Sequence, residues 1–91
     1  MSLPNPASPP GPERAFGAVL RELRRARGLS QERLALEAGY DRSYVGELER
    51  GEKSPSLRTI FRLARAIGVS PSALLAAVEA RLPPPTGDQG A

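Results

Sequence analysis

The sequence predicts an all-α protein with one small core built from five helices. Apolar residues recur at helical spacing in several segments, glycines and prolines separate these segments, and no stretch alternates with period two over the length of a strand. The ordered domain is expected at 13–82. The tails, 1–12 and 83–91, are rich in Pro, Gly and Ser with almost nothing to bury, so we expect them to be disordered.

The first helix is expected over 13–27. Its apolar residues stand at i, i+3, i+4 and i+7 and form one face. They are Phe16, Val19, Leu20 and Leu23. Arginines and glutamates fill most of the other positions, and Gly28 is expected to end the helix.

The stretch from Leu29 to Gly51 predicts two short helices joined by a tight turn. Ser30 is a candidate N-cap of the first, without the glutamate or glutamine that would complete a capping box. Gly39 stands where a helix most often ends with a positive φ, and Asp41 is a candidate cap for the next helix. This is the spacing of a helix-turn-helix.

The second of these helices has one apolar and one polar face. Val45 and Leu48, three residues apart, are expected to point into the core. The residues expected on the outward face are Arg42, Ser43, Gly46, Glu47 and Arg50. A helix that reads DNA needs this layout.

Two further helices are expected after a polar loop. The fourth runs from the cap candidate Ser56 to Ile67, with an apolar stripe broad enough to cross the middle of the core. That stripe consists of Leu57, Ile60, Phe61, Leu63, Ala64 and Ile67. The fifth begins with a Ser70 cap and Pro71 and continues through Leu82 until the prolines at 83–85 end it.

Composition excludes several classes of protein. There is no Cys and no His, which removes disulfides, thiol nucleophiles, the usual zinc ligands and Ser-His-Asp catalysis. Glu47 and Glu49 are two apart, hence about 200° around a helix, and do not form a catalytic pair. We therefore expect no enzyme, cofactor, metal or small-molecule ligand.

The charge and hydropathy patterns limit the kind of partner and the place in the cell that we expect for this protein. A formal net charge of +3 favours an anionic partner, although solvated charge on a small helical domain explains it equally well. No apolar run approaches the roughly 20 residues of a membrane span, and no signal segment opens the chain. We expect a cytoplasmic protein.

Several residues at fixed spacing resemble a known family over roughly residues 13–80. The matching features are Leu29-Ser30-Gln31, Leu34-Ala35, Gly39, Val45, Leu48-Glu49, Gly51, Pro55-Ser56-Leu57 and Ala66-Ile67-Gly68-Val69. This pattern resembles the phage-repressor-like helix-turn-helix family of the lambda repressor and Cro. Within it, the residues around Asp41–Val45 and Glu49–Gly51 are similar to controller proteins of restriction-modification systems. The resemblance implies a repressor-like domain that binds double-stranded DNA, commonly as a symmetric dimer.

The resemblance also implies roles for individual residues. Gln31 matches a glutamine that contacts a phosphate and braces the recognition helix, with a capping role as the alternative. Arg42 and Ser43 match positions that reach base edges, and an Arg fork suits guanine O6 and N7. Glu49 matches a glutamate that pairs with an arginine of the first helix, here Arg24. This pair is expected to be structural and to point the guanidinium at the DNA backbone.

Other residues of the recognition helix leave alternatives open. Tyr44 either contacts the DNA backbone or covers the edge of the core. Glu47 fits in the major groove only where it accepts from cytosine N4 or is held by an arginine; otherwise it orients Arg42 or lies outside the contact. Further backbone contacts are expected from the residues that follow, Arg50, Lys53, Ser54 and Ser56.

The last helix suggests a homodimer. Part of the apolar strip formed by Leu74, Leu75, Val78 and Leu82 is expected to remain exposed and to pair with a second copy on a palindromic operator. The alternative is that this helix only folds onto its own chain.

The sequence thus predicts a DNA-binding transcription regulator. The rival hypothesis is a protein-interaction module on the same scaffold, as in an antitoxin or coactivator.

Overall fold

The structure is a computed structural model that describes residues 11–84. It contains five helices in this range and no strand: α1 (Pro12–Ala26), α2 (Gln31–Ala38), α3 (Arg42–Glu49), α4 (Leu57–Ile67) and α5 (Pro71–Ala80). The all-α prediction is confirmed. Disordered tails are expected from the sequence at 1–12 and 83–91; the parts 1–10 and 85–91 lie outside the described residues, so the domain limits 13–82 stay a prediction.

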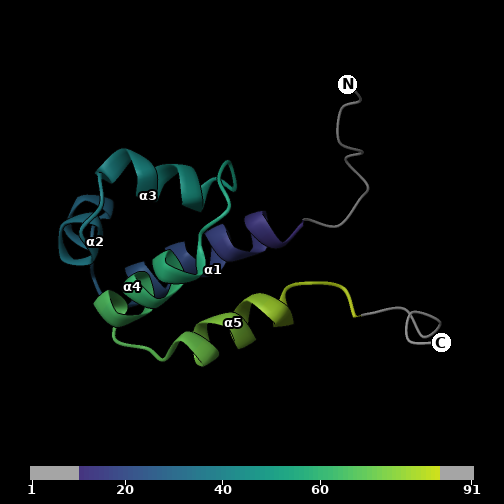
Figure 1. The fold of residues 1–91 in the computed structure, drawn as a ribbon. Coiled ribbons are helices and arrows are strands. Elements are labelled where there is room, and N and C mark those ends of the chain that lie inside the picture. The colour runs from purple at the N-terminus through teal and green to yellow at the C-terminus, as the bar shows by residue number, and fades with distance from the viewer. Residues whose placement is uncertain (1–10, 85–91) are drawn as a thin grey trace, which may run out of the picture.

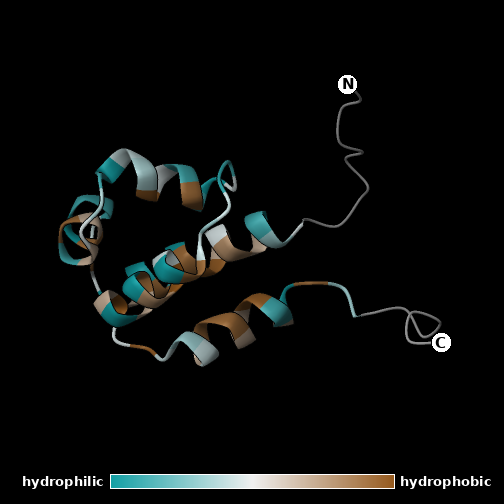
Figure 2. Ribbon diagram, viewed as in Figure 1, coloured by the Kyte–Doolittle hydropathy of each residue, from teal (hydrophilic) through white to brown (hydrophobic). Residues whose placement is uncertain are grey.

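The helices form a single small bundle, with α3 on one side and α5 on the opposite side of α1 and α4 (Figure 1). α1 contacts both α3 and α5, whereas α2 contacts α3 and α4. Their apolar faces turn inward, and hydrophilic residues take most of the outer surface of α2 and α3 (Figure 2). This packing leaves the outer face of α3 uncovered by any other described helix.

The helix ends follow the predicted capping residues, with one exception. The hydroxyls of Ser30, Ser56 and Ser70 each accept a bond from the backbone N–H three residues on. Gly39 ends α2 at φ +83°, a conformation that a side chain with a Cβ disfavours. Asp41 occupies the N-cap position of α3 but makes no side-chain capping bond, so its predicted capping role is wrong in this structure.

Three helix boundaries differ from the sequence prediction. α1 ends at Ala26, one residue before the expected end, with Arg27 as its C-cap. α1 begins one residue early, at Pro12, because proline is favoured at the first helical position, where its missing N–H is not needed. α5 ends at Ala80 with Arg81 as its C-cap, so Leu82 follows the helix instead of continuing it.

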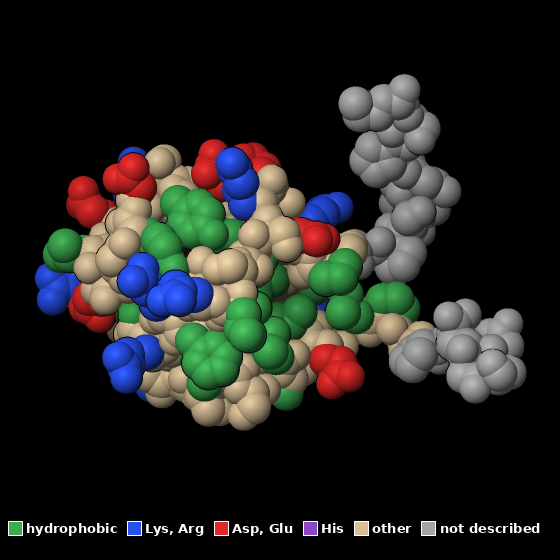
Figure 3. Space-filling view, viewed as in Figure 1, with side chains coloured by type: hydrophobic (Ala, Val, Ile, Leu, Met, Phe, Trp, Pro, Cys, Tyr) green, Lys and Arg blue, Asp and Glu red, His purple; other side chains and the backbone are tan. Residues whose placement is uncertain are grey.

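The core is formed by buried residues from all five helices. They are Ala15, Phe16, Val19, Leu20, Leu34, Ala35, Ala38, Val45, Leu48, Leu63, Ala64, Ile67, Leu74 and Val78. The predicted broad stripe of α4 is only partly buried: Leu57 is 68% exposed and Phe61 is 54% exposed. Neither α2 nor α5 reaches far enough around α4 to cover that edge. Figure 3 shows the resulting hydrophobic side chains over α4 and α5.

No single helix among residues 11–84 is long and apolar enough to cross a membrane. α4 and α5 pass such a test together by length and composition, but they are bent by 103° at the break between them.

Candidate nucleic-acid interface

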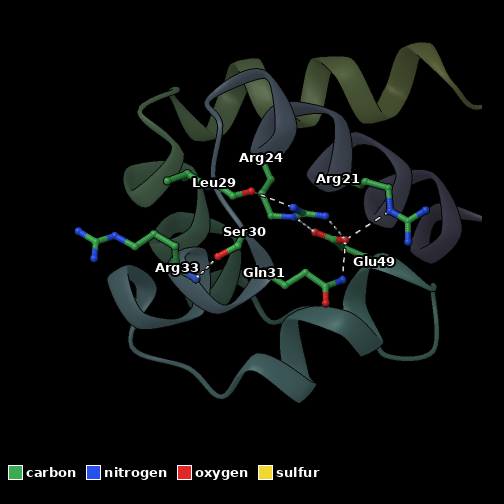
Figure 4. Close-up of polar contacts among 7 residues, drawn as sticks. All are labelled: Arg21, Arg24, Leu29, Ser30, Gln31, Arg33 and Glu49. Carbon is green, nitrogen blue, oxygen red and sulfur yellow. Dashed lines mark hydrogen bonds and ion pairs between the residues drawn. The ribbon is translucent and has the colours of Figure 1, made fainter.

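The C-terminal end of α3 is held by the buried carboxylate of Glu49 (Figure 4). The Arg24 guanidinium donates to it twice, from Nε to Oε2 at 2.6 Å and from Nη2 to Oε1 at 3.0 Å. The amide of Gln31 donates to Oε1 at 3.0 Å, and Nε of Arg21 donates to the same oxygen at 3.4 Å. Nη1 of Arg24 donates to the Leu29 carbonyl at 2.8 Å. One carboxylate therefore joins α1, α2 and α3.

This network sets the charge state of Glu49. Burial alone would raise the pKa of its carboxyl group. The hydrogen bonds from Arg24 and Gln31, the charge of Arg24 and the weaker bond from Arg21 together outweigh burial and lower the pKa below its ordinary value. Glu49 is therefore ionised near neutral pH and serves as a structural ion-pair partner.

Arg24 is the main partner of Glu49 in this network. Its residue is only 8% exposed, and three of its N–H groups are bonded to Glu49 and Leu29. The expected ion pair is present. These bonds hold the guanidinium between α1 and α3, and the expected contact of Arg24 with the DNA backbone stays a prediction.

Gly17 lets α1 and α3 approach one another closely, whereas Gly46 is near side chains only. A Cβ added to Gly17 of α1 would collide with the backbone carbonyl oxygens of Leu48 and Glu49. Gly46 of α3 is buried, and a Cβ there would meet the guanidinium of Arg50 at 3.0 Å. Gly46 thus lies on the same face as Arg50, as expected, but the side chains of Gln31 and Arg50 cover it.

The N-terminal end of α3 is open. Asp41, Arg42 and Ser43 are all exposed. The side chains of Arg42 and Ser43 form no hydrogen bond or ion pair with any residue in the range 11–84. Glu47, one turn further along, is partly buried. The first turn of α3 therefore presents unpaired polar groups to solvent.

Tyr44 lies against the edge of the core. Its ring is 5.1 Å from that of Tyr40 between centroids, and its hydroxyl is 3.4 Å from Oγ1 of Thr59. The Tyr40 hydroxyl is 2.9 Å from the same oxygen, and the Arg62 guanidinium lies 5.4 Å above the Tyr40 ring. Of the two roles left open for Tyr44, these contacts favour covering the core.

The segment after α3 carries polar groups, some already bonded within the chain. Nε of Arg50 donates to Glu52 at 2.7 Å, and this hydrogen bond is the main reason that the pKa of Glu52 is lowered. Lys53 and Ser54 are exposed. Ser56 is also exposed, but its hydroxyl caps α4 through the N–H of Thr59. Lys53 and Ser54 are thus the freest of the expected backbone contacts.

The apolar strip of α5 is divided between the core and the surface. Leu74 is fully buried and Val78 nearly so. Leu75 is 41% exposed and Leu82 is partly buried. Leu74 therefore cannot contact a second copy, which corrects its assignment to a dimer interface.

Sequence reasoning missed two members of this site. Arg21 reaches Glu49, and its position three residues before Arg24, on a neighbouring part of the same helix face, could have indicated this. The close approach of Gly17 to α3 could not be found in the same way, because no local pattern in α1 reveals which helix crosses it.

Comparison with known proteins identifies the family. The family model described as HTH_3, helix-turn-helix, matches residues 20–74. The chain belongs to this family. It is the phage-repressor-like family indicated by the sequence, and its members include DNA-binding transcription regulators and controller proteins.

Three similar proteins lie within the controller group. Control protein C.BamHI of Bacillus amyloliquefaciens is 39% identical over 61 residues, 66% of this chain and 75% of that protein. Control protein C.SmaI of Serratia marcescens is 41% identical over 56 residues, 62% of this chain and 67% of that protein. The crystal structure of the restriction-modification controller protein C.AhdI from Aeromonas hydrophila has a TM-score of 0.66 at 54% identity, covering 67% of this chain and 92% of that one.

Proposed function

We propose that this protein is a controller-like transcription regulator that reads double-stranded DNA in the major groove with α3, as a homodimer. The observation that carries the proposal is the open first turn of α3, where Arg42 and Ser43 project from a helix fixed at its other end. An arginine in this position can donate two bonds to a guanine edge. A helix that is held in place and carries hydrogen-bond donors without internal partners is suited to base recognition.

Phosphate contacts would come from both sides of α3. Gln31 begins α2 and is braced by Glu49, so its position relative to α3 is fixed. Lys53 and Ser54 flank the other end, with Arg50 and Ser56 beside them. Such contacts orient a protein on the duplex without reading its sequence.

A second copy would bind through the exposed part of α5. Leu75 and Leu82 line a shallow groove together with Ser72, Ala76 and Glu79. A two-fold pair formed on this face would present two copies of α3 to a palindromic operator, with half-site centres roughly 34 Å apart. Sedimentation equilibrium tests this: Leu75→Glu should yield monomers, and Phe61→Ser, on α4, is the matched control that should leave the dimer intact.

The DNA proposal is tested by selecting bound duplexes from a random pool and measuring their affinity. The Arg42→Ala variant should lose roughly 1–3 kcal/mol of discrimination at one base position of each half-site, while non-specific binding changes little. Gln31→Ala should instead weaken binding to all sequences alike. An unchanged preference in Arg42→Ala would reject readout by this residue.

The rival hypothesis gives a different result in the same experiment. A protein-interaction module on this scaffold would bind no duplex even at low salt, where phosphate contacts are strongest. That result in the wild-type protein would reject the DNA proposal as a whole.

A further inference from the structure

A basic hollow lies between α1 and the C-terminal end of α3. Four arginines line it, Arg14, Arg21, Arg25 and Arg50, together with Ala18 and two glutamates. Three of these arginines come from α1 at spacings of seven and four residues, which places them along one face of that helix. None of the three belongs to the contacts proposed above.

The glutamates of the hollow already have partners within the chain. Glu49 is bonded to Arg24 and Gln31 as well as to Arg21. Glu22 forms an ion pair with Arg81, which follows α5. Arg50 is paired with Glu52 outside the hollow, so the uncompensated positive charge of the hollow is that of the other arginines, which lie on α1.

Two of the arginines have no internal counterpart. Arg14 and Arg25 are exposed, and neither has a hydrogen-bond or ion-pair partner within residues 11–84. Arg21 and Arg25 are like charges four residues apart on a helix, an arrangement that is slightly destabilising on its own. An anion bound across the hollow would remove this repulsion.

The hollow adjoins the proposed DNA surface. Arg21 of α1 and Gln31 of α2 donate to the same Glu49 oxygen (Figure 4). Arg50 forms another part of the lining and directly precedes the loop with the proposed phosphate contacts. The Arg14 stem packs beneath Gly51 of that loop. The basic surface of α1 is thus continuous with the end of the recognition helix.

We propose that Arg14, Arg21 and Arg25 form a second phosphate-binding surface, which holds the DNA backbone flanking the segment read by α3. This inference rests on the proposed function. Because phosphates carry no direct sequence information, the surface adds affinity and salt dependence and leaves base preference unchanged. It extends the contact along the duplex from α3 onto α1.

The test is the salt dependence of duplex binding by the double variant Arg14→Gln/Arg25→Gln. Glutamine keeps the inner part of each stem, including the Arg14 Cγ that packs against Gly51. The slope of log K against log salt should become shallower by about 0.9 for each lost contact, hence by up to about 1.8 for each subunit and up to about 3.6 for the proposed dimer. The ratio of affinities for the selected and a scrambled duplex should stay constant.

The matched control is Arg62→Gln/Arg65→Gln, which removes the same charge from α4. Its slope should equal that of the wild type. Shortening the duplex flanks should make the wild-type slope shallower, and should change the slope of the α1 variant less, because only Arg21 of the proposed surface remains in it. Thermal unfolding of both variants establishes that they are folded.

The contrary outcomes separate this inference from the function on which it rests. If the wild type prefers its selected site and the α1 variant keeps the wild-type slope, the second surface is rejected and the proposed function stands. If the wild type binds no duplex, both fail. Tripolyphosphate is the probe for a small anion: its binding at Arg14 and Arg25, with an unchanged DNA slope, would assign the hollow to a free polyphosphate and overturn the proposal.

Discussion

The two ends of α3 are built in opposite ways. At the C-terminal end, Glu49 is buried and accepts from Arg21, Arg24 and Gln31. At the N-terminal end, Arg42 is exposed and has no partner within residues 11–84. Hydrogen bonds therefore hold α3 at its C-terminal end, and its N-terminal end carries side chains without partners. A reading residue needs no bonds of its own within the protein when the helix carrying it is held in place elsewhere.

The largest expected effect comes from breaking the fixed end. Glu49→Ala would leave the Arg24 guanidinium buried without its counter-charge, and removing one partner of such a pair typically costs about 3–5 kcal/mol. Urea unfolding followed by circular dichroism measures the loss. Glu52→Ala, which removes an exposed carboxylate from Arg50, should change stability by less than about 1 kcal/mol. If both variants lose the same free energy of unfolding, the buried network stabilises the protein no more than the exposed ion pair does.

A somewhat smaller effect is expected where α1 crosses α3. Gly17→Ala places a methyl group against the carbonyl oxygens of Leu48 and Glu49, and overpacking of this kind typically costs about 1–3 kcal/mol. The backbone carbonyls cannot move without shifting α3.

Gly46→Ala is the matched control for that substitution. Its methyl group meets only the end of the flexible Arg50 side chain, and alanine is the better helix former by up to about 1 kcal/mol. We expect thermal unfolding of Gly46→Ala to change little or to shift upward. A Gly17→Ala variant as stable as the wild type would contradict the tight crossing of α1 and α3.

The fixed end also predicts how stability depends on pH. Because the pKa of the Glu49 carboxyl group is lowered in the folded state, ionisation of this group stabilises the fold. This contribution to the free energy of unfolding is fully present above the unfolded pKa near 4.5, and it is lost as the pH falls through the folded pKa. Each unit of lowering corresponds to about 1.4 kcal/mol. Urea unfolding between pH 6 and pH 3 measures this on the wild type and on Glu49→Gln, which lacks the titrating group and should give the flatter curve. If the free energy of unfolding falls equally in the wild type and in Glu49→Gln, carboxylates other than Glu49 dominate acid unfolding.

The sequence predicted the local features of the fold well. Helical periodicity located all five helices, and serine caps and glycines marked most of their ends, because these signals act over a few neighbouring residues. The pairing of Arg24 with Glu49 is confirmed as well, but it came from the family resemblance. No local pattern brings together two residues 25 positions apart.

What the sequence could not determine depends on packing between helices. The stripe of α4 is apolar along its length, yet Leu57 and Phe61 remain exposed because no described element covers that edge. Likewise, Leu74 and Leu75 are chemically identical neighbours, and only the position of α1 and α4 decides which one is buried. The two roles of Tyr44 were equally consistent with the sequence until the neighbouring Thr59 was located.

The smallest expected change in stability tests the free end of α3. Arg42 sits in the first turn, where the helix dipole disfavours a positive charge, and alanine has the higher helix propensity. Arg42→Ala should therefore leave the free energy of unfolding unchanged or raise it by up to about 0.5 kcal/mol at low salt, with the difference fading as salt screens the dipole. Ser43→Ala, an uncharged change in the same turn, should show no such salt dependence. A loss of more than about 1 kcal/mol in Arg42→Ala would mean that this side chain supports the fold, and α3 would then be held at both ends. A gain in the free energy of unfolding would instead indicate that Arg42 destabilises the free protein. This is expected for a residue whose partner is an anionic ligand outside the chain.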